Sequence, residues 1–225
     1  MPGLALMAID IAHCAYCTEE PATTADHVPP KSFFPSPKPS NLITVPACPA
    51  CNQGAGKDEE FFLATFMFSD AGTSEAGTRL WNEKLRRMYS KNWGLRRAIG
   101  SLLSHVNVTT PAGLYLGRRI AIDVDDSRLE RVVTKIVRGL YFFEYGDRLH
   151  KTSSVQVLYL RSEDHVNLAK AHNHEMRDGS RGWDGVFRYR FNRVATRPQG
   201  SLWLLMFYDF AVFMAVTNEG RTAES

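Results

Sequence analysis

Long apolar runs are missing from this sequence of 225 residues. The most apolar stretch, 202–216, contains Asp209 and is too short to cross a bilayer, because a spanning helix needs about 20 residues. The first 13 residues have neither the positive start nor the apolar segment of a secretory leader. We therefore expect a soluble, cytoplasmic protein with no membrane partner.

Cysteine is scarce and confined to the first quarter of the chain. The pairs Cys14–Cys17 and Cys48–Cys51 each enclose two residues, and 30 residues separate the pairs. In a reducing compartment such cysteines are more often metal ligands than disulfides. Four thiolates fill the shell of one tetrahedral ion, so we predict a structural zinc that supplies folding free energy. The alternative is a pair of redox or disulfide motifs.

Basic side chains are almost missing from the first 75 residues, which hold Lys31, Lys38 and Lys57 against nine acidic residues. The net charge of +3 is the sum of −6 for this part and +9 for the remainder, which has 24 basic and 15 acidic side chains. Such asymmetry is typical of a protein with a polyanionic partner, and a solvated basic surface is an equal alternative.

The apolar pattern predicts an α+β fold. Helical spacing is clearest at 126–145, where Asp125 or Asp126 can cap the start and Gly146 can end the helix. Five prolines make the loop at 29–39 extended rather than helical. Further helices are predicted at 58–68, 78–92, 95–106 and 164–174, strands at 118–124, 155–160, 186–194, 201–208 and 211–217, and a linker at 70–77.

These elements divide the chain near residue 70. We predict an N-terminal domain at 1–70 that contains all four cysteines. The remainder, 71–225, is predicted to be a basic α+β domain with a mainly antiparallel sheet, in which the last two strands form a tight hairpin.

Polar residues between and after the cysteine pairs follow a specific order. Asp26-His27-Val28-Pro29 follows the first pair, Asn41-Leu42-Ile43 lies midway, and Asn52 follows Cys51 directly, with Lys57 beyond it. In order and spacing this pattern resembles the HNH endonucleases, and the resemblance covers residues 14–60. It implies a zinc-stapled ββα-metal module, in which two strands and a helix surround one catalytic metal.

The resemblance also implies a role for each residue. His27 would be the general base that activates water, Asp26 and Asn52 would hold the catalytic metal, and Asn41 would brace the loop that orients His27. The family often has histidine where this chain has Asn52. Oxygen donors favour Mg²⁺ or Mn²⁺ over zinc. The implied reaction hydrolyses a phosphodiester to a 5′-phosphate and a 3′-hydroxyl.

The same residues suit phosphodiester hydrolysis on chemical grounds. The reaction needs an in-line water, a base with a pKa near neutral and a cation that balances the developing charge. Histidine is the natural base near pH 7. Each residue also has a structural alternative: Asp26 as a turn or cap residue, Asn41 as a turn former and Asn52 as a helix cap. A lone His27 is likewise more often structural than catalytic.

Two basic clusters are candidates for binding nucleic acid, together with Lys57. The first spans 19 residues, is opposed by Glu83 alone and comprises Arg79, Lys84, Arg86, Arg87, Lys91, Arg96 and Arg97. We expect the interleaved aromatic residues to lie mainly in the core. The second cluster, Arg188 and Arg190, lies on one face of a predicted strand, and a solvated strand face is its equal alternative.

The sequence thus predicts a metal-dependent endonuclease that cuts DNA in preference to RNA, with one structural zinc and one catalytic Mg²⁺ or Mn²⁺. The C-terminal domain would position the nucleic acid or dock a protein partner. Two other functions stay open: a non-catalytic zinc-binding nucleic-acid adaptor and a scaffold protein. The oligomeric state is also left open.

Overall fold

A computed structural model describes residues 13–67, 69–161, 163–197 and 199–219. The N-terminal elements are β1 (Thr24–Val28), η1 (Lys31–Phe33), β2 (Ile43–Ala47), α1 (Pro49–Gly54) and α2 (Gly56–Met67). They are followed by η2 (Asp70–Thr73), α3 (Glu75–Leu80), the π-helical turn η3 (Trp81–Leu85), α4 (Arg86–Lys91), α5 (Trp93–Gly100), β3 (Leu103–Thr109) and β4 (Tyr115–Ile122). The last elements are α6 (Asp126–Tyr145), β5 (Ser154–Tyr159), α7 (Glu163–Asn173), β6 (Arg177–Asp178), β7 (Phe187–Arg193), β8 (Ser201–Phe207) and β9 (Ala211–Asn218). The predicted α+β class is confirmed.

The N-terminal elements are two strands followed by a helix. β1 and β2 pair in antiparallel register, with Asp26 opposite Val45 and His27 opposite Thr44. Cys48 is the N-cap of α1, and its Sγ accepts a hydrogen bond from the Cys51 amide. The second cysteine pair therefore starts the helix that carries the residues following it.

The C-terminal part contains a five-stranded antiparallel sheet in the order β5-β9-β8-β7-β6. The predicted hairpin is β8–β9. Its connection has three residues, 208–210, and the first two, Tyr208 and Asp209, have φ values of 53° and 62°, in the left-handed region that such tight hairpin turns use. Residues alternate along β8 and β9 between buried and half-buried positions, so one face of these two central strands is entirely covered.

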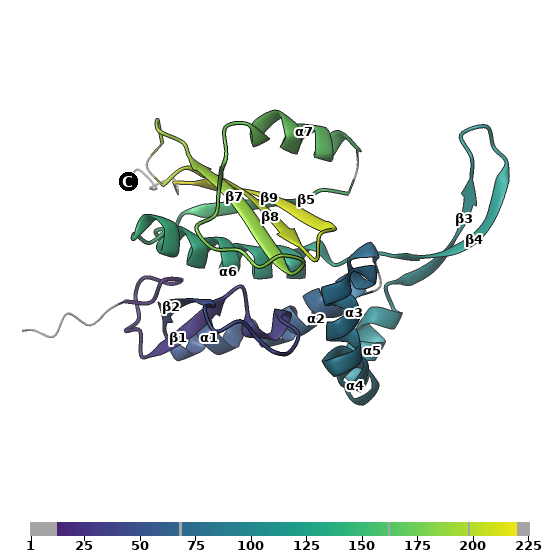
Figure 1. The fold of residues 1–225 in the computed structure, drawn as a ribbon, viewed down its shortest axis with the longest axis horizontal. Helices are drawn as coiled ribbons and strands as arrows, with labels where there is room; N and C mark the ends of the chain where they lie inside the picture. Colours follow the sequence, from purple (N-terminus) through teal and green to yellow (C-terminus); the bar gives the residue numbers. More distant parts are fainter. Residues whose placement is uncertain (1–12, 68, 162, 198, 220–225) are drawn as a thin grey trace, which may run out of the picture.

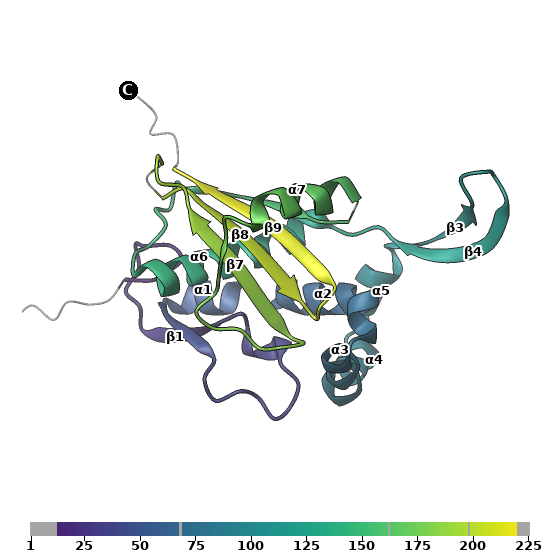
Figure 2. The same cartoon turned by 45° about the horizontal axis from the view of Figure 1, so that its top comes forward.

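Helix α6 lies between the N-terminal strands and the sheet, and α7 lies on the opposite face of the sheet (Figures 1 and 2). The structure confirms the helix predicted at 126–145, with Asp125 in the N-cap position and Gly146 in the left-handed conformation at φ 66°. Its buried face holds Leu129, Val132, Val133, Ile136, Val137, Gly139, Leu140 and Tyr141. Because both neighbours pack on this one helix, α6 joins the two halves of the chain.

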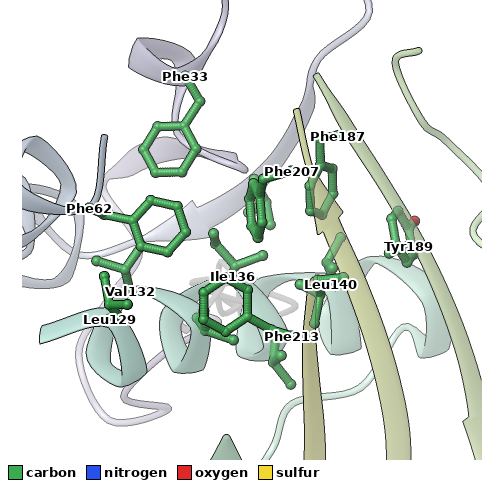
Figure 3. Packing of buried hydrophobic residues seen from close by; sticks show 14 of the residues in the cluster. Phe33, Phe62, Leu129, Val132, Ile136, Leu140, Phe187, Tyr189, Phe207 and Phe213 are labelled. Atoms are coloured by element: carbon green, nitrogen blue, oxygen red, sulfur yellow. The ribbon is translucent and has the colours of Figure 1, made fainter. Parts of the chain in front are cut away.

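The core is continuous across residue 70. Phe62 of α2 lies 5.1 Å from Phe207 of β8 between ring centroids, and Phe33 lies 6.0 Å from the same ring. Figure 3 shows these rings facing Leu129, Val132 and Ile136 of α6. The domain boundary at residue 70 stays a prediction, but the two parts share one hydrophobic cluster that runs from Cys14 to Ala215.

Some of the predicted elements are wrong. The helix predicted at 95–106 ends at Gly100, and Leu103 begins a strand. The predicted linker at 70–77 contains η2 and the start of α3. The strand predicted at 118–124 is β4, which begins earlier, at Tyr115. Among the described residues, β3 and β4 pair only with each other, and they form a ribbon that projects from the body of the protein (Figures 1 and 2).

Candidate functional site

The four cysteines meet at one point beside β1 and α1. Their Sγ atoms all lie within 4.8 Å of one another, and those of Cys17 and Cys48 are 4.0 Å apart. The cysteines are free, and tetrahedral thiolates around zinc would be spaced by about 3.8 Å for Zn–S bonds of about 2.3 Å. The Tyr16 and Cys51 amides donate to Cys14 and Cys48 Sγ at 3.4 and 3.5 Å. The cluster can hold a metal ion such as zinc.

The thiols of this cluster differ in acidity. Burial raises the pKa of Cys51, and its hydrogen bond with Cys48 adds to the rise. At Cys17 burial also acts to raise the pKa, but hydrogen bonds from the backbone of Glu20 and Glu19 outweigh it and lower the pKa to about 7. Of these two thiols, Cys17 therefore becomes the thiolate that a metal requires more readily than Cys51 does.

Asp26 is buried on β1, with a relative exposure of 7%, and both of its carboxylate oxygens have partners. Oδ1 accepts a hydrogen bond of 2.8 Å from the backbone amide of His27. Oδ2 accepts one of 3.0 Å from the Tyr16 hydroxyl and lies 2.9 Å from Lys135 Nζ. The carboxylate predicted to hold a metal is thus paired with a cation of the chain itself.

Lys135 reaches this point from α6. Its Nζ lies 3.0 Å from Glu59 Oε1 and 3.3 Å from the carbonyl oxygen of Asn52, besides its contact with Asp26. Burial opposes the positive charge, but hydrogen bonding to Asp26 and the attraction of Glu59 outweigh it, so the pKa of Lys135 is raised. An ammonium group therefore lies among oxygen atoms from β1, α1 and α2.

Neither Lys135 nor Glu59 was predicted as a site residue. Glu59 belongs to an acidic first turn of α2, a common position near a helix N-terminus. Lys135 belongs to the polar face of α6, as many solvated lysines do. No local pattern marks either residue, because the two meet only when α6 packs on α2.

A second ion-pair cluster fixes α2 to α6. Asp58 Oδ1 and Oδ2 each lie 2.7 Å from an arginine Nε, those of Arg128 and Arg131 respectively. Hydrogen bonding to Arg131 is the main cause that lowers the pKa of Asp58. This cluster and Lys135 place α6 firmly against the helix that follows the cysteine cluster.

His27 follows Asp26 on β1, and its side chain is half-buried. Burial lowers its pKa, and the nearby positive charges of Lys31 and Lys38 lower it further, against the opposing effect of Asp26. The imidazole is therefore neutral at neutral pH and able to accept a proton.

The two predicted asparagines have different surroundings. Asn52 Nδ2 donates to Thr24 Oγ1 at 3.1 Å and to the Ala25 carbonyl at 3.4 Å, which fixes α1 against β1. Asn41 Oδ1 accepts a hydrogen bond of 3.1 Å from Trp183 Nε1. The structure thus brings Asn52 of α1 against β1, the strand of Asp26 and His27, and fixes Asn41 to the C-terminal part.

The first basic cluster extends over α3, η3, α4 and α5, and all seven of its side chains are exposed. Within the described part of the chain, only Arg79 among them makes an ion pair, with Glu83 at 3.9 Å. Glu83 also accepts a hydrogen bond of 2.7 Å from the Ser36 amide, and Arg79 donates to the Ser36 carbonyl. The basic cluster therefore adjoins the proline-rich loop that follows His27. Lys57, at the start of α2, is exposed as well.

The aromatic residues of this cluster have two environments. Trp81 and Tyr89 pack against the core, as expected. Trp93 is 66% exposed, and the Arg97 guanidinium lies 5.6 Å from its ring centroid.

The second basic cluster is balanced by acidic residues. Arg188 lies 2.8 Å from Asp209, and Arg190 lies 2.9 Å from Asp178. Arg190 also donates to the carbonyl of Met176 at 2.8 Å. Both charges are thus paired with a carboxylate, and their role in binding nucleic acid stays a prediction.

Comparison with protein-family models, curated proteins and solved structures gives no match for this chain. None of the helices in its described residues has the length and apolar character to cross a membrane. What the chain does therefore has to be inferred from the site.

Proposed function

We propose that the protein is a metal-dependent endonuclease of the HNH type that hydrolyses phosphodiester bonds in DNA, with RNA as the second choice. One observation supports the proposal most directly. Two strands and a helix lie next to a four-cysteine cluster, with Asp26 and His27 on strand β1 and Asn52 of α1 packed against that strand. In this proposal the cysteine cluster holds structural zinc.

His27 is the general base. Its lowered pKa leaves the imidazole neutral at pH 7, and its half-buried position on β1 leaves part of the side chain open to water. The proton of the attacking water passes to this imidazole. The hydrogen bond from the His27 amide to Asp26 fixes the backbone at this point.

Asp26 and Asn52 would hold Mg²⁺ or Mn²⁺. The donor set fits a hard cation, because the positive charge of Lys135 is already held there by two carboxylates and a carbonyl. When bound, the ion would stabilise the negative charge that develops on the phosphate. Lys135 has to release Asp26 before a metal can take this carboxylate.

The exposed basic cluster would bind the nucleic-acid backbone. Apart from Arg79, none of its charges is balanced by an acidic side chain in the described residues. Because it adjoins the loop after β1, a backbone bound there passes close to His27.

The direct test is nicking of supercoiled plasmid, first without divalent ions and then with increasing Mg²⁺ or Mn²⁺. We expect nicking that depends on the added ion, at constant zinc content. No nicking with either ion by zinc-loaded, folded protein would overturn the proposal.

A second function, the zinc-binding nucleic-acid adaptor, is favoured by the pairing of Asp26 with Lys135. If that pair is purely structural, Lys135→Met leaves Asp26 unpaired and destabilises the fold by about 3–5 kcal/mol, whatever metal is present. If the oxygens form a metal site, Mn²⁺ will raise the melting temperature of Lys135→Met well above its effect on wild type. Arg131→Met, which removes a cation from Asp58, is the matched control.

A further inference from the structure

The ribbon formed by β3 and β4, residues 103–122, has no role in the proposed site. None of its side chains is fully buried, and Figures 1 and 2 show it extending away from every other element. An isolated two-stranded ribbon gains little stability in water by itself. Its large apolar side chains are nevertheless exposed: Leu103, Val106, Leu114, Tyr115, Leu116 and Ile120.

The charge of this region points to a polyanion. Residues 84–122 contain eight basic side chains and no aspartate or glutamate. Two of the eight, Arg118 and Arg119, lie on β4, and the other six lie on the helices that lead to the ribbon. The regular negative charge of a nucleic-acid backbone suits this row of positive charges better than an acidic protein surface does. A second copy of the same basic ribbon would be repelled.

The two faces of the ribbon differ. His105 is opposite Ile120 and Asn107 is opposite Arg118, so these four side chains share one face. Arg119 is opposite Val106 on the other face. Arginine, asparagine and histidine are side chains that hydrogen-bond to base edges, and one face carries all three.

The dimensions also suit a groove. Each strand spans roughly 20 Å, and the major groove of duplex DNA, about 12 Å wide, admits a two-stranded ribbon. The tip, Thr110-Pro111-Ala112-Gly113, is followed by the exposed Leu114. Apolar side chains at such positions can contact bases or enter a base step.

We propose that the ribbon binds duplex DNA, with the face of His105, Asn107 and Arg118 turned into a groove. The basic helices α3–α5 and the ribbon then form one continuous contact with the duplex. The partner rests on the proposed function, but the contact itself does not require cleavage.

The ribbon can be removed cleanly. The Asp123 amide donates to the Leu102 carbonyl at 2.8 Å, so its two ends are neighbours. Replacing 103–122 by Asn-Gly should close this gap with a two-residue turn. Ile122, at the base of the ribbon, packs partly buried against the core, whereas the large apolar side chains further out are exposed, so the deletion should lower the melting temperature only slightly. A variant with Arg118→Glu and Arg119→Glu keeps the full chain.

The measurement is the affinity for a labelled duplex of 30 base pairs at several salt concentrations, without divalent ions. We expect the deletion to weaken binding at least tenfold. The double variant should also weaken binding and reduce the log–log salt slope, by about 0.9 for each phosphate that the protein no longer neutralises. Lys170→Glu, an exposed charge reversal on α7, should change neither.

Unchanged affinity and slope would overturn the proposal. So would a deletion that converts a dimer into a monomer without affecting DNA affinity, or a wild-type protein that binds anionic vesicles but not the duplex. Cleavage of bis(p-nitrophenyl) phosphate, which is too small to reach the ribbon, tests the active site separately. If neither the wild type nor the deletion variant cleaves this substrate, but the deletion variant binds the duplex more weakly, the nuclease proposal fails and the ribbon proposal stands.

Discussion

At the scale of single residues, the charges around β1 determine what the site can do. Asp26 and Glu59 are buried carboxylates that need a positive partner, and Lys135 is that partner in the free protein. His27 stands beside this pair with a lowered pKa. The histidine and its aspartate neighbour could be predicted from sequence, because they are adjacent. Lys135 could not, because more than 100 residues separate it from Asp26.

Replacing His27 by alanine should lower cleavage by roughly 10²–10⁴-fold, the usual contribution of a positioned general base. Zinc content and the melting temperature should stay near wild type, because His27 is not one of the four clustered cysteines. The exposed His172 on α7 provides the matched control, and His172→Ala should cleave at the wild-type rate. Near wild-type cleavage by folded His27→Ala would show that another group is the base.

The acid side of the pH–rate profile should also report on His27. Only the neutral imidazole accepts a proton, and the folded protein lowers its pKa, so activity should persist below about pH 6.5, the ordinary histidine value. Lys31→Gln removes a positive neighbour and should move the acid limb to higher pH. Lys170→Gln, far along the chain on α7, should leave it in place. Identical profiles for wild type and Lys31→Gln would contradict the assignment.

At the scale of elements, prediction succeeded where an element buries one face. Helix α6 was predicted with its observed bounds, because its apolar residues recur at helical spacing and Gly146 ends it. The segment 101–106 was wrongly predicted as helix. Residues 103–106 belong to a ribbon in which neither face is fully buried, so their apolar residues carry no periodic signal of the strand they form.

The exposed helices α4 and α5 should contribute directly to DNA affinity. Arg86→Glu with Arg87→Glu should weaken binding and lower the log–log salt slope by about 0.9 for each phosphate that is left without its cation. Both side chains are exposed and carry no ion pair in the described part of the chain, so the melting temperature should hardly change. A charge reversal at the exposed Lys170 is the control, and equal effects at both places would mean that the helices are not a specific surface.

At the scale of the whole molecule, one core serves both halves of the chain. The cysteine cluster, β1 and β2 pack on α6 from one side and the sheet packs on it from the other (Figure 1). The predicted boundary at residue 70 followed a change of composition, and composition gives no information on how two parts pack. The exposed basic surface of α3–α5, in contrast, was visible in the sequence as clustered charge.

Loss of the metal should therefore unfold more than the N-terminal part. Elemental analysis of freshly purified, reduced protein should find one zinc per chain, and Cys48→Ser should lower both zinc content and stability. We expect the amides of β8, including that of the fully buried Trp203, to lose hydrogen-exchange protection together with those of β1. Protection of β8 that is unaffected by zinc removal would mean that the two halves unfold independently.

The position of α6 has a consequence for synthesis on the ribosome. Residues 13–67 leave the ribosome before α6, with their four cysteines and several of the aromatic residues that face the sheet. Val28 lies against Gly139 of α6, and Phe62 faces the same helix (Figure 3), so neither side chain can be covered until α6 has also emerged, some 80 residues later. During that interval the nascent chain exposes aggregation-prone hydrophobic surface and free cysteines at the same time. Zinc binding at this stage would keep residues 13–67 folded until α6 can pack against them.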